Sequence, residues 1–236
     1  MLKFICQVLL IPLALLSCNS TQQNNQVTNP ILVTEKAPPK PLPVIPSNYD
    51  KDLKFPDQTA SLVMLERHTY EEPLLGASIR YENRYYDEDE IAIYTYPIRH
   101  FSWQHNRYLL SSEMRNIFSE IDNAVAQGLY QKREGKEVSV YQFYWHGKQY
   151  SGLKAKTKIY LLSGLEYTSY SYLFVQKDKF IKFRISQPNA NNLAAPDNLV
   201  REILPYIDVP SESNYMSKLR ELHRKEYEKS LGIMSM

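Results

Sequence analysis

Apolar and polar positions alternate through residues 61–97, and this pattern predicts three strands. Within it, Ala77, Ile79 and Tyr81 alternate with polar side chains, which is the period of a strand with one buried face. The acidic run at residues 87–90 predicts a turn, so the second and third strands are expected to form a hairpin. The expected strands are residues 61–68, 76–83 and 91–97.

An apolar stripe at helical spacing follows these strands and predicts a helix. Ser111 or Ser112 is expected to cap its N-terminus, because a hydroxyl can accept a hydrogen bond from the free N–H groups there. Gly128 is the expected residue just after its C-terminus. The stripe consists of Met114, Ile117, Phe118, Ile121 and Val125.

Residues 137–186 predict a meander of about four strands. In the last of these strands, Ile181, Phe183 and Ile185 alternate with two basic residues, so one face is expected to be buried and the other to face water. The expected turns lie at residues 146–147, 163–164 and 177–178.

Two further helices are expected near the C-terminus. Pro196 suits the first position of a short apolar helix that Pro205 ends. Residues 211–231 predict a charged helix, whose cations and carboxylates form a solvated face. The alternative is that the helix docks a partner through its narrow apolar stripe. Its narrow apolar stripe consists of Tyr215, Leu219 and Leu222.

Runs of strands with segregated helices predict an α+β domain: an antiparallel sheet of about six to seven strands with two or three helices packed on it. Over residues 60–208 the order of elements resembles that of the photosystem II extrinsic PsbP-like proteins. That resemblance implies an α/β/α sandwich fold and carries no function.

The N-terminus has a positive start at Lys3, an apolar stretch over residues 4–16, and then Ser17 and Cys18. The stretch is too short for a stable membrane span, which needs about 20 apolar residues. An apolar region of this length with small residues at its end is typical of a secretory signal. The order Leu-Leu-Ser-Cys at residues 15–18 resembles the lipobox of bacterial lipoproteins, and an ordinary secretory signal is the alternative.

The lipoprotein resemblance implies cleavage between Ser17 and Cys18, a diacylglyceryl group on the Cys18 thiol, and N-acylation of the new terminus. Two or more acyl chains are needed for stable anchoring, and this modification supplies them. Asn19 stands where an aspartate often signals inner-membrane retention in such families. The resemblance therefore implies an outer-membrane lipoprotein facing the periplasm, if the host is Gram-negative.

A disordered tether over residues 18–57 is expected to follow the signal at residues 1–17. Its first part is rich in Asn and Gln and cannot bury a core. Its second part is rich in proline and favours an extended spacer, although a ligand for another domain is the alternative. The α+β domain is then expected at residues 58–210 and the charged helix at residues 211–236.

Net charge and cysteine content limit the partners and the reactions that can be expected of this protein. The formal charge of the 236 residues is +2, and loss of Lys3 with the signal leaves +1, so no nucleic-acid partner is expected. The two cysteines are Cys6, which leaves with the signal, and Cys18, which carries lipid. The mature domain then has no thiol for a disulfide, for catalysis or for a metal site.

Candidate catalytic and metal-binding residues are few. His100 and His105 flank a loop, but a catalytic zinc usually needs three protein ligands, and none is tied to them. The acidic run at residues 87–90 lacks the regular calcium-loop signature and is expected to be a solvated turn. Ser-Gly pairs at residues 151–152 and 163–164 are expected at or near turns, and no Gly-x-Ser-x-Gly elbow is present. No catalytic residue, cofactor or metal is therefore predicted.

Aromatic side chains in the predicted sheet are the remaining candidates for a binding site. They could form a face that stacks on sugars or meets a partner protein, or they could fill the core under the helices. The candidates are Tyr141, Phe143, Trp145, Tyr170 and Tyr172.

The sequence therefore favours a membrane-anchored envelope lipoprotein that binds or scaffolds an envelope protein or a cell-wall partner. The first alternative is an envelope enzyme, such as a cell-wall polymer hydrolase, whose site is scattered in sequence. The second is a purely structural assembly factor.

Overall fold

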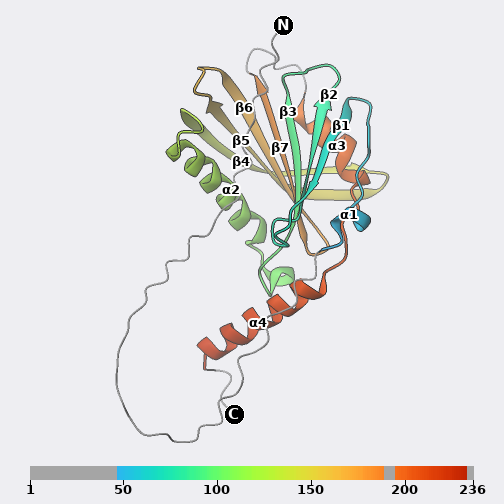
Figure 1. Cartoon of the computed structure of the whole chain (residues 1–236), viewed down its shortest axis with the longest axis vertical. Coiled ribbons are helices and arrows are strands. Elements are labelled where there is room, and N and C mark those ends of the chain that lie inside the picture. The colour runs from blue at the N-terminus through green and yellow to red at the C-terminus, as the bar shows by residue number, and fades with distance from the viewer. Residues whose placement is uncertain (1–46, 189–194, 233–236) are drawn as a thin grey trace, which may run out of the picture. The chain divides into compact units, whose positions relative to one another are not determined.

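The computed structural model describes residues 47–188 and 195–232, all of them in the unit formed by residues 41–236. In this part of the chain, seven antiparallel strands form one sheet in the order β1-β2-β3-β7-β6-β5-β4 (Figure 1). The strands are β1 (Leu62–Thr69), β2 (Ala77–Asn83), β3 (Glu90–Pro97), β4 (Lys132–Trp145), β5 (Lys148–Tyr160), β6 (Glu166–Gln176) and β7 (Lys179–Pro188). The helices are α1 (Tyr49–Asp52), α2 (Leu109–Ala126), α3 (Pro196–Ile203) and α4 (Asn214–Ser230), with one-turn 3-10 helices η1 (Trp103–His105) and η3 (Leu204–Tyr206). The predicted α+β class is confirmed.

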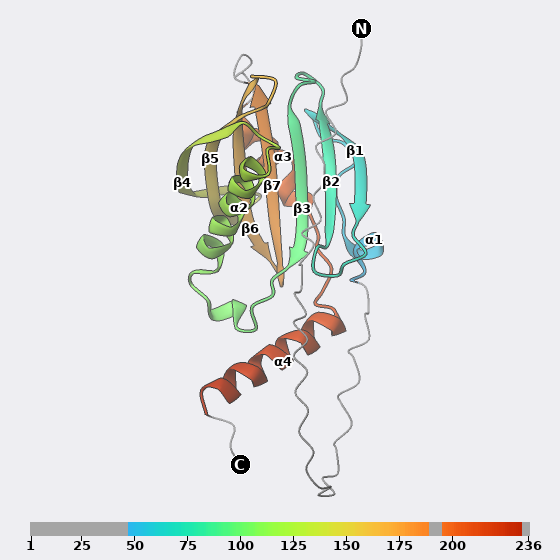
Figure 2. The ribbon, with the colours of Figure 1, turned by 60° about the vertical axis from the view of Figure 1, so that its left-hand side comes forward.

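Both faces of the sheet are covered, each by a different helix (Figures 1 and 2). On one face, Tyr172 and Phe174 of β6 pack in the same core as Leu199 and Val200 of α3. On the other face, Leu173 of β6 packs in a second core with residues of α2. Because neighbouring strand residues point to opposite faces, a single strand supplies both cores.

The sheet consists of two antiparallel meanders, β1 to β3 and β4 to β7, which are joined by the pairing of β3 with β7. The predicted β2–β3 hairpin is present, and Ile79 lies opposite Ile93 in it. The predicted meander is also present as β4 to β7. β3 then pairs with β7, which sets Ile93 opposite Phe183 and makes the apolar positions of both halves one continuous core.

Helix α2 ends as predicted and begins earlier than predicted. Gly128 has φ +73°, and the N–H groups of Gly128 and Leu129 donate to the carbonyls of Val125 and Ala124. This is the Schellman arrangement that satisfies the last carbonyls of a helix. At the other end the N-cap is Tyr108, so the expectation of a serine cap at Ser111 or Ser112 is wrong.

The folded domain begins before residue 58, which corrects the expected end of the tether at residue 57. Tyr49 and Leu53 of the α1 region are buried in the core that contains α3. The backbone N–H of Lys54 donates to the carbonyl of Asp208 at 2.9 Å, which ties this segment to the chain after η3. The sequence masks this role because the two apolar residues follow directly on the proline-rich run. The predicted signal, Cys18 and the tether up to residue 46 lie outside the described residues.

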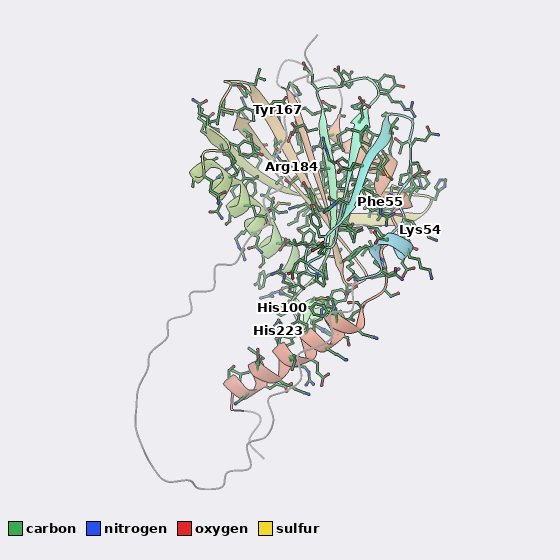
Figure 3. The ribbon with its side chains drawn as sticks, viewed as in Figure 1. Lys54, Phe55, His100, Tyr167, Arg184 and His223 are labelled. Atoms are coloured by element: carbon green, nitrogen blue, oxygen red, sulfur yellow. The ribbon has the colours of Figure 1, made fainter. Side chains whose placement is uncertain are left out.

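The second face of β7 is covered, which corrects the expectation that it faces water. The guanidinium of Arg184 donates to the hydroxyl of Tyr130 at 2.7 Å, and Figure 3 labels Arg184 on the sheet. The ammonium of Lys182 lies 3.3 Å from the carboxylate of Glu120 on α2. Long basic side chains can lie along a covered surface in this way, because their stems are apolar and only their ends need polar partners.

The buried stripe of helix α4 matches the predicted stripe only in part. The Ser213 hydroxyl caps it by accepting a hydrogen bond from the N–H of Met216. Met216 and Arg220 are the buried residues of this helix, whereas Leu222 is exposed. The predicted stripe is therefore wrong at Leu222, whereas Tyr215 and Leu219 are partly buried. The pattern missed Arg220 because a buried arginine does not register as apolar. Among the described residues, no helix is long and apolar enough to cross a membrane.

Candidate functional site

The five predicted aromatic residues lie on two strands and point to the face that α3 covers. Tyr141, Phe143 and Tyr172 are buried in the core of that face, and Trp145 and Tyr170 are partly buried against it. The expectation of an exposed binding face is therefore wrong for the three buried residues. Their place matches the prediction that these aromatic side chains fill the core of the sheet.

Asp197, in the first turn of α3, holds the helix onto these aromatic residues. Its carboxylate accepts hydrogen bonds from the Tyr172 hydroxyl and from the ammonium of Lys154, the latter at 2.6 Å. The Tyr141 hydroxyl donates to the backbone carbonyl of Asp197 at 3.2 Å. The Tyr141 and Tyr172 rings meet edge to face, with centroids 5.0 Å apart. The aromatic hydroxyls thus serve as donors that fix α3, a role that the sequence did not indicate.

The charges around Asp197 set its protonation. Burial raises the pKa of Asp197, but the hydrogen bonds from Lys154 and Tyr172 outweigh burial and lower the pKa overall. Burial, followed by the hydrogen bond to Asp197, raises the pKa of Tyr172. Tyr172 is therefore held protonated next to an ionised carboxylate, which suits a structural clamp.

The opposite side of β4 is open to solvent. Val138, Val140 and Tyr144 are 47%, 64% and 71% exposed, and they alternate with the buried Tyr141 and Phe143 on the same strand. β4 also forms one end of the strand order, so no described strand pairs with its outer edge. An exposed apolar edge strand is a template for pairing with another chain. We take this face and edge, residues 138–144, as the candidate site and call it the β4 edge.

Both ends of the β4 edge are built into the fold. At the start of the strand, the pairing with β5 shifts between Glu134 and Glu137, and Gly135 has φ +73°. At the far end, His146 and Gly147 form a two-residue turn with positive φ at both positions, the geometry of a tight hairpin. Between these ends, residues 138–145 carry no charged side chain. The site is therefore an uncharged stretch of β4 that lies between a charged bulge and a tight turn.

The sequence correctly indicated strand β4, but the candidate residues of that strand lie on its buried face and not on its exposed face. Alternation shows that Tyr141 and Phe143 lie on the face opposite Val140 and Tyr144. It does not show which face a helix covers or which strand lies at the edge, because α3 and β5 come later in the chain. The available signal was the uncharged run at residues 138–145, which is typical of segments that pair strand to strand.

His100 and His105 belong to no group of metal ligands among the described residues. Nδ1 of His100 lies 3.2 Å from the hydroxyl of Ser102, its neighbour in the same loop. In the parts of the chain that the structure describes, no three His, Cys, Asp or Glu side chains are grouped to hold a metal ion. The acidic turn is only partly solvated, because Asp89 is buried and accepts hydrogen bonds from the amides of Asn83 and Gln187. This corrects the solvated-turn prediction at Asp89.

The two Ser-Gly pairs differ. Gly164 has φ +84° in the turn before β6, as predicted. Gly152 lies in the middle of β5, where a Cβ would overlap the carbonyl oxygen of Leu173 and come within 2.6 Å of the Phe174 ring. Residues 151–152 therefore lie within a strand that follows the turn at residues 146–147. Glycine is needed there because strand β6 and the Phe174 ring approach the backbone too closely for any side chain.

The matches of this chain among known proteins come from solved structures. No protein-family model and no curated protein matches the sequence. Among solved structures, the chain is similar to the solution structure of cyanobacterial PsbP (CyanoP) from Synechocystis sp. PCC 6803. The match has 12% sequence identity and a TM-score of 0.40, and it covers 67% of this chain and 92% of that one.

Proposed function

We propose that this chain is a lipid-anchored binding or scaffolding module of the bacterial cell envelope, whose binding surface is the β4 edge. The observation that carries the binding role is the exposure of Val138, Val140 and Tyr144 on the uncharged part of β4, whose outer edge pairs with no described strand. Such a strand offers main-chain hydrogen bonds to a partner, and its side chains supply selectivity. The lipobox-like sequence at residues 15–18 supports the anchor.

The anchor is tested by mass spectrometry of the N-terminal peptide and by membrane fractionation. A mature chain that begins at a lipidated Cys18 is expected, and Cys18→Ser should release the protein from the membrane fraction. Cys6→Ser is the matched control, because Cys6 is expected to leave with the signal and should change neither result. An unmodified Cys18, or a mature chain that begins elsewhere, would overturn the anchor.

The predicted destination is tested separately in a Gram-negative host. The wild-type protein should sediment with outer-membrane markers. Asn19→Asp should move it to the inner-membrane fraction, because aspartate at this position often signals retention in the families that the sequence resembles. A wild-type protein found with inner-membrane markers would contradict the assignment.

The binding surface is tested by placing a photo-crosslinking amino acid at Val140 in the full chain within membranes. Tyr85 is the matched control, because it is 70% exposed, similar to Val140, and lies in the β2–β3 connection. An adduct of defined mass is expected at Val140 and absent at Tyr85. The absence of any adduct at Val140, or equal adducts at both positions, would overturn the role of the β4 edge.

A further inference from the structure

The hairpin geometry shows which backbone groups of β4 are available to a partner. Trp145 and Lys148 pair across the two-residue turn, and the closing pair of such a hairpin exchanges hydrogen bonds. Counting back in steps of two, Tyr141 and Phe143 direct their N–H and C=O groups toward β5. The alternate residues of the strand direct their N–H and C=O groups outward, away from β5. These outward residues are Val138, Val140, Gln142 and Tyr144.

The outward backbone groups and the exposed side chains therefore belong to the same residues. Val140 offers its N–H and C=O groups at the edge, while its side chain is 64% exposed on the open face. A partner strand that bonds to this edge would cover the valines and Tyr144 at the same time. The edge thus combines main-chain pairing with apolar burial, which together drive strand addition.

The distribution of charge along β4 fits a second copy of the same strand. The charged residues of β4 lie between Lys132 and Glu137, and residues 138–145 are neutral. In an antiparallel self-pair, the neutral half of each strand meets the neutral half of the other. In a parallel self-pair, each charge would lie beside an identical charge, which is destabilising. Self-complementarity therefore favours the antiparallel arrangement.

We propose that two copies of this chain pair through their β4 edges, antiparallel, about a two-fold axis at Tyr141. This arrangement sets Val138 of each copy opposite Tyr144 of the other, and Val140 opposite Gln142. The outward-directed residues then meet one another, and the two sheets join into one. The inference rests on the proposed function for the choice of the β4 edge, and it names the partner.

Membrane anchoring would favour this pairing. A single strand-to-strand contact is a small interface, and small interfaces are typical of weak complexes. Confinement of two lipid-anchored copies to one membrane surface raises their effective concentration, as a linker does for two tethered modules. The dimer is therefore expected to be populated on membranes at protein levels where dilute detergent solutions hold monomers.

The register is tested by disulfide trapping in membranes from cells that make two differently tagged full-length copies. One copy carries Val140→Cys and the other carries Gln142→Cys, and an oxidant is added. Directly opposed Cβ atoms in a sheet lie about 4.5–5.5 Å apart, so crosslinking is expected at least tenfold above the control pair. The control pair combines Gln142→Cys with Tyr85→Cys. Equal crosslinking of both pairs would overturn the proposed register.

The association itself is tested by the concentration dependence of mass for the purified lipidated protein in detergent. Val140→Lys should weaken dimerisation at least tenfold by placing two like charges in the paired region, whereas Tyr85→Lys should not. Val140→Pro is the second variant, since it removes the outward N–H and leaves the β4–β5 hydrogen bonds intact. A wild-type chain that stays monomeric at every concentration and on membranes would overturn the proposal.

The photo-crosslinking experiment separates this proposal from the proposed function. An adduct at Val140 with the mass of two copies supports both. An adduct with a different protein, or a crosslink within one chain, overturns self-pairing. An adduct with a different protein would still support the β4 edge as a binding surface. An absence of adducts would overturn both self-pairing and the proposed binding surface.

Discussion

The guanidinium of Arg220 on α4 lies 3.0 Å from the carboxylate of Asp178 in the β6–β7 turn, and both side chains are buried. The same guanidinium donates to the backbone carbonyl of Ile98, just after β3, and pairs with Glu212. Asp178 also pairs with the buried ammonium of Lys179. One arginine thus joins α4, the end of β3 and the β6–β7 turn.

Arg220→Ala is expected to lower the free energy of unfolding by about 1–3 kcal/mol, because it removes a hydrogen-bond donor from the Ile98 carbonyl and one of the two cations that pair with the buried Asp178. Arg224→Ala is the matched control on the same helix. Arg224 pairs with Glu228 at an exposed site, so its loss should cost about 0.5 kcal/mol or less. Urea denaturation followed by circular dichroism measures both. Equal effects of the two variants would contradict a role for the Arg220–Asp178 pair.

Gly76→Ala is expected to be strongly destabilising. Gly76 has φ +68°, and an added Cβ would overlap the carbonyl oxygen of Thr95 and lie 2.8 Å from Cα of Tyr96. Gly164→Ala is the control, because its φ is +84° and nothing lies within 4 Å of the added atom. The left-handed backbone alone should cost about 1–2 kcal/mol at each position. Thermal unfolding should show a clearly larger loss at Gly76, and equal losses would argue against the overlap.

The clamp at Asp197 predicts a stability that depends on acid pH. Because the folded-state pKa of Asp197 is lowered, its contribution is present above the unfolded pKa of about 3.9. That contribution is lost as the pH falls through the folded pKa. The difference in unfolding free energy between wild type and Asp197→Asn should therefore shrink toward low pH. Tyr172→Phe removes one of the hydrogen bonds that lower the folded-state pKa, so this loss should be smaller and should be complete at a higher pH. A pH-independent difference would contradict the clamp.

Asp89 predicts a dependence of opposite sign. Burial raises its pKa, and the hydrogen bonds from Gln187 and Asn83 only partly offset that shift. Between the unfolded pKa of about 3.9 and the raised folded pKa, the native state binds more protons, so stability falls as the pH rises. Asp89→Asn should lose this slope, and urea denaturation from about pH 3 upward measures it, because that range includes the unfolded pKa. A slope unchanged by the substitution would assign it to other groups.

Local pattern was sufficient for most elements of this protein. Alternation at Ala77, Ile79 and Tyr81 predicted β2, and the stripe through Ile117 and Phe118 predicted α2. These predictions hold because burial on one face imposes a period on the sequence, whatever covers that face. The C-terminus of α2 was also predictable, because Gly128 adopts the left-handed backbone that such an ending requires.

Only the tertiary structure decided which predicted surfaces are covered. The same alternation in β4 marks Tyr141 on one face and Val140 on the other. The Tyr141 face is core because α3 packs on it, and the hydrogen bond between Asp197 of α3 and Tyr172 of β6 is part of that packing. Likewise, arginine is usually exposed. Arg220 is buried because its guanidinium donates hydrogen bonds to Asp178 and Ile98, which come from distant segments of the chain. Periodicity is a property of neighbours in sequence, whereas coverage and edge position depend on strand order and on contacts between distant residues.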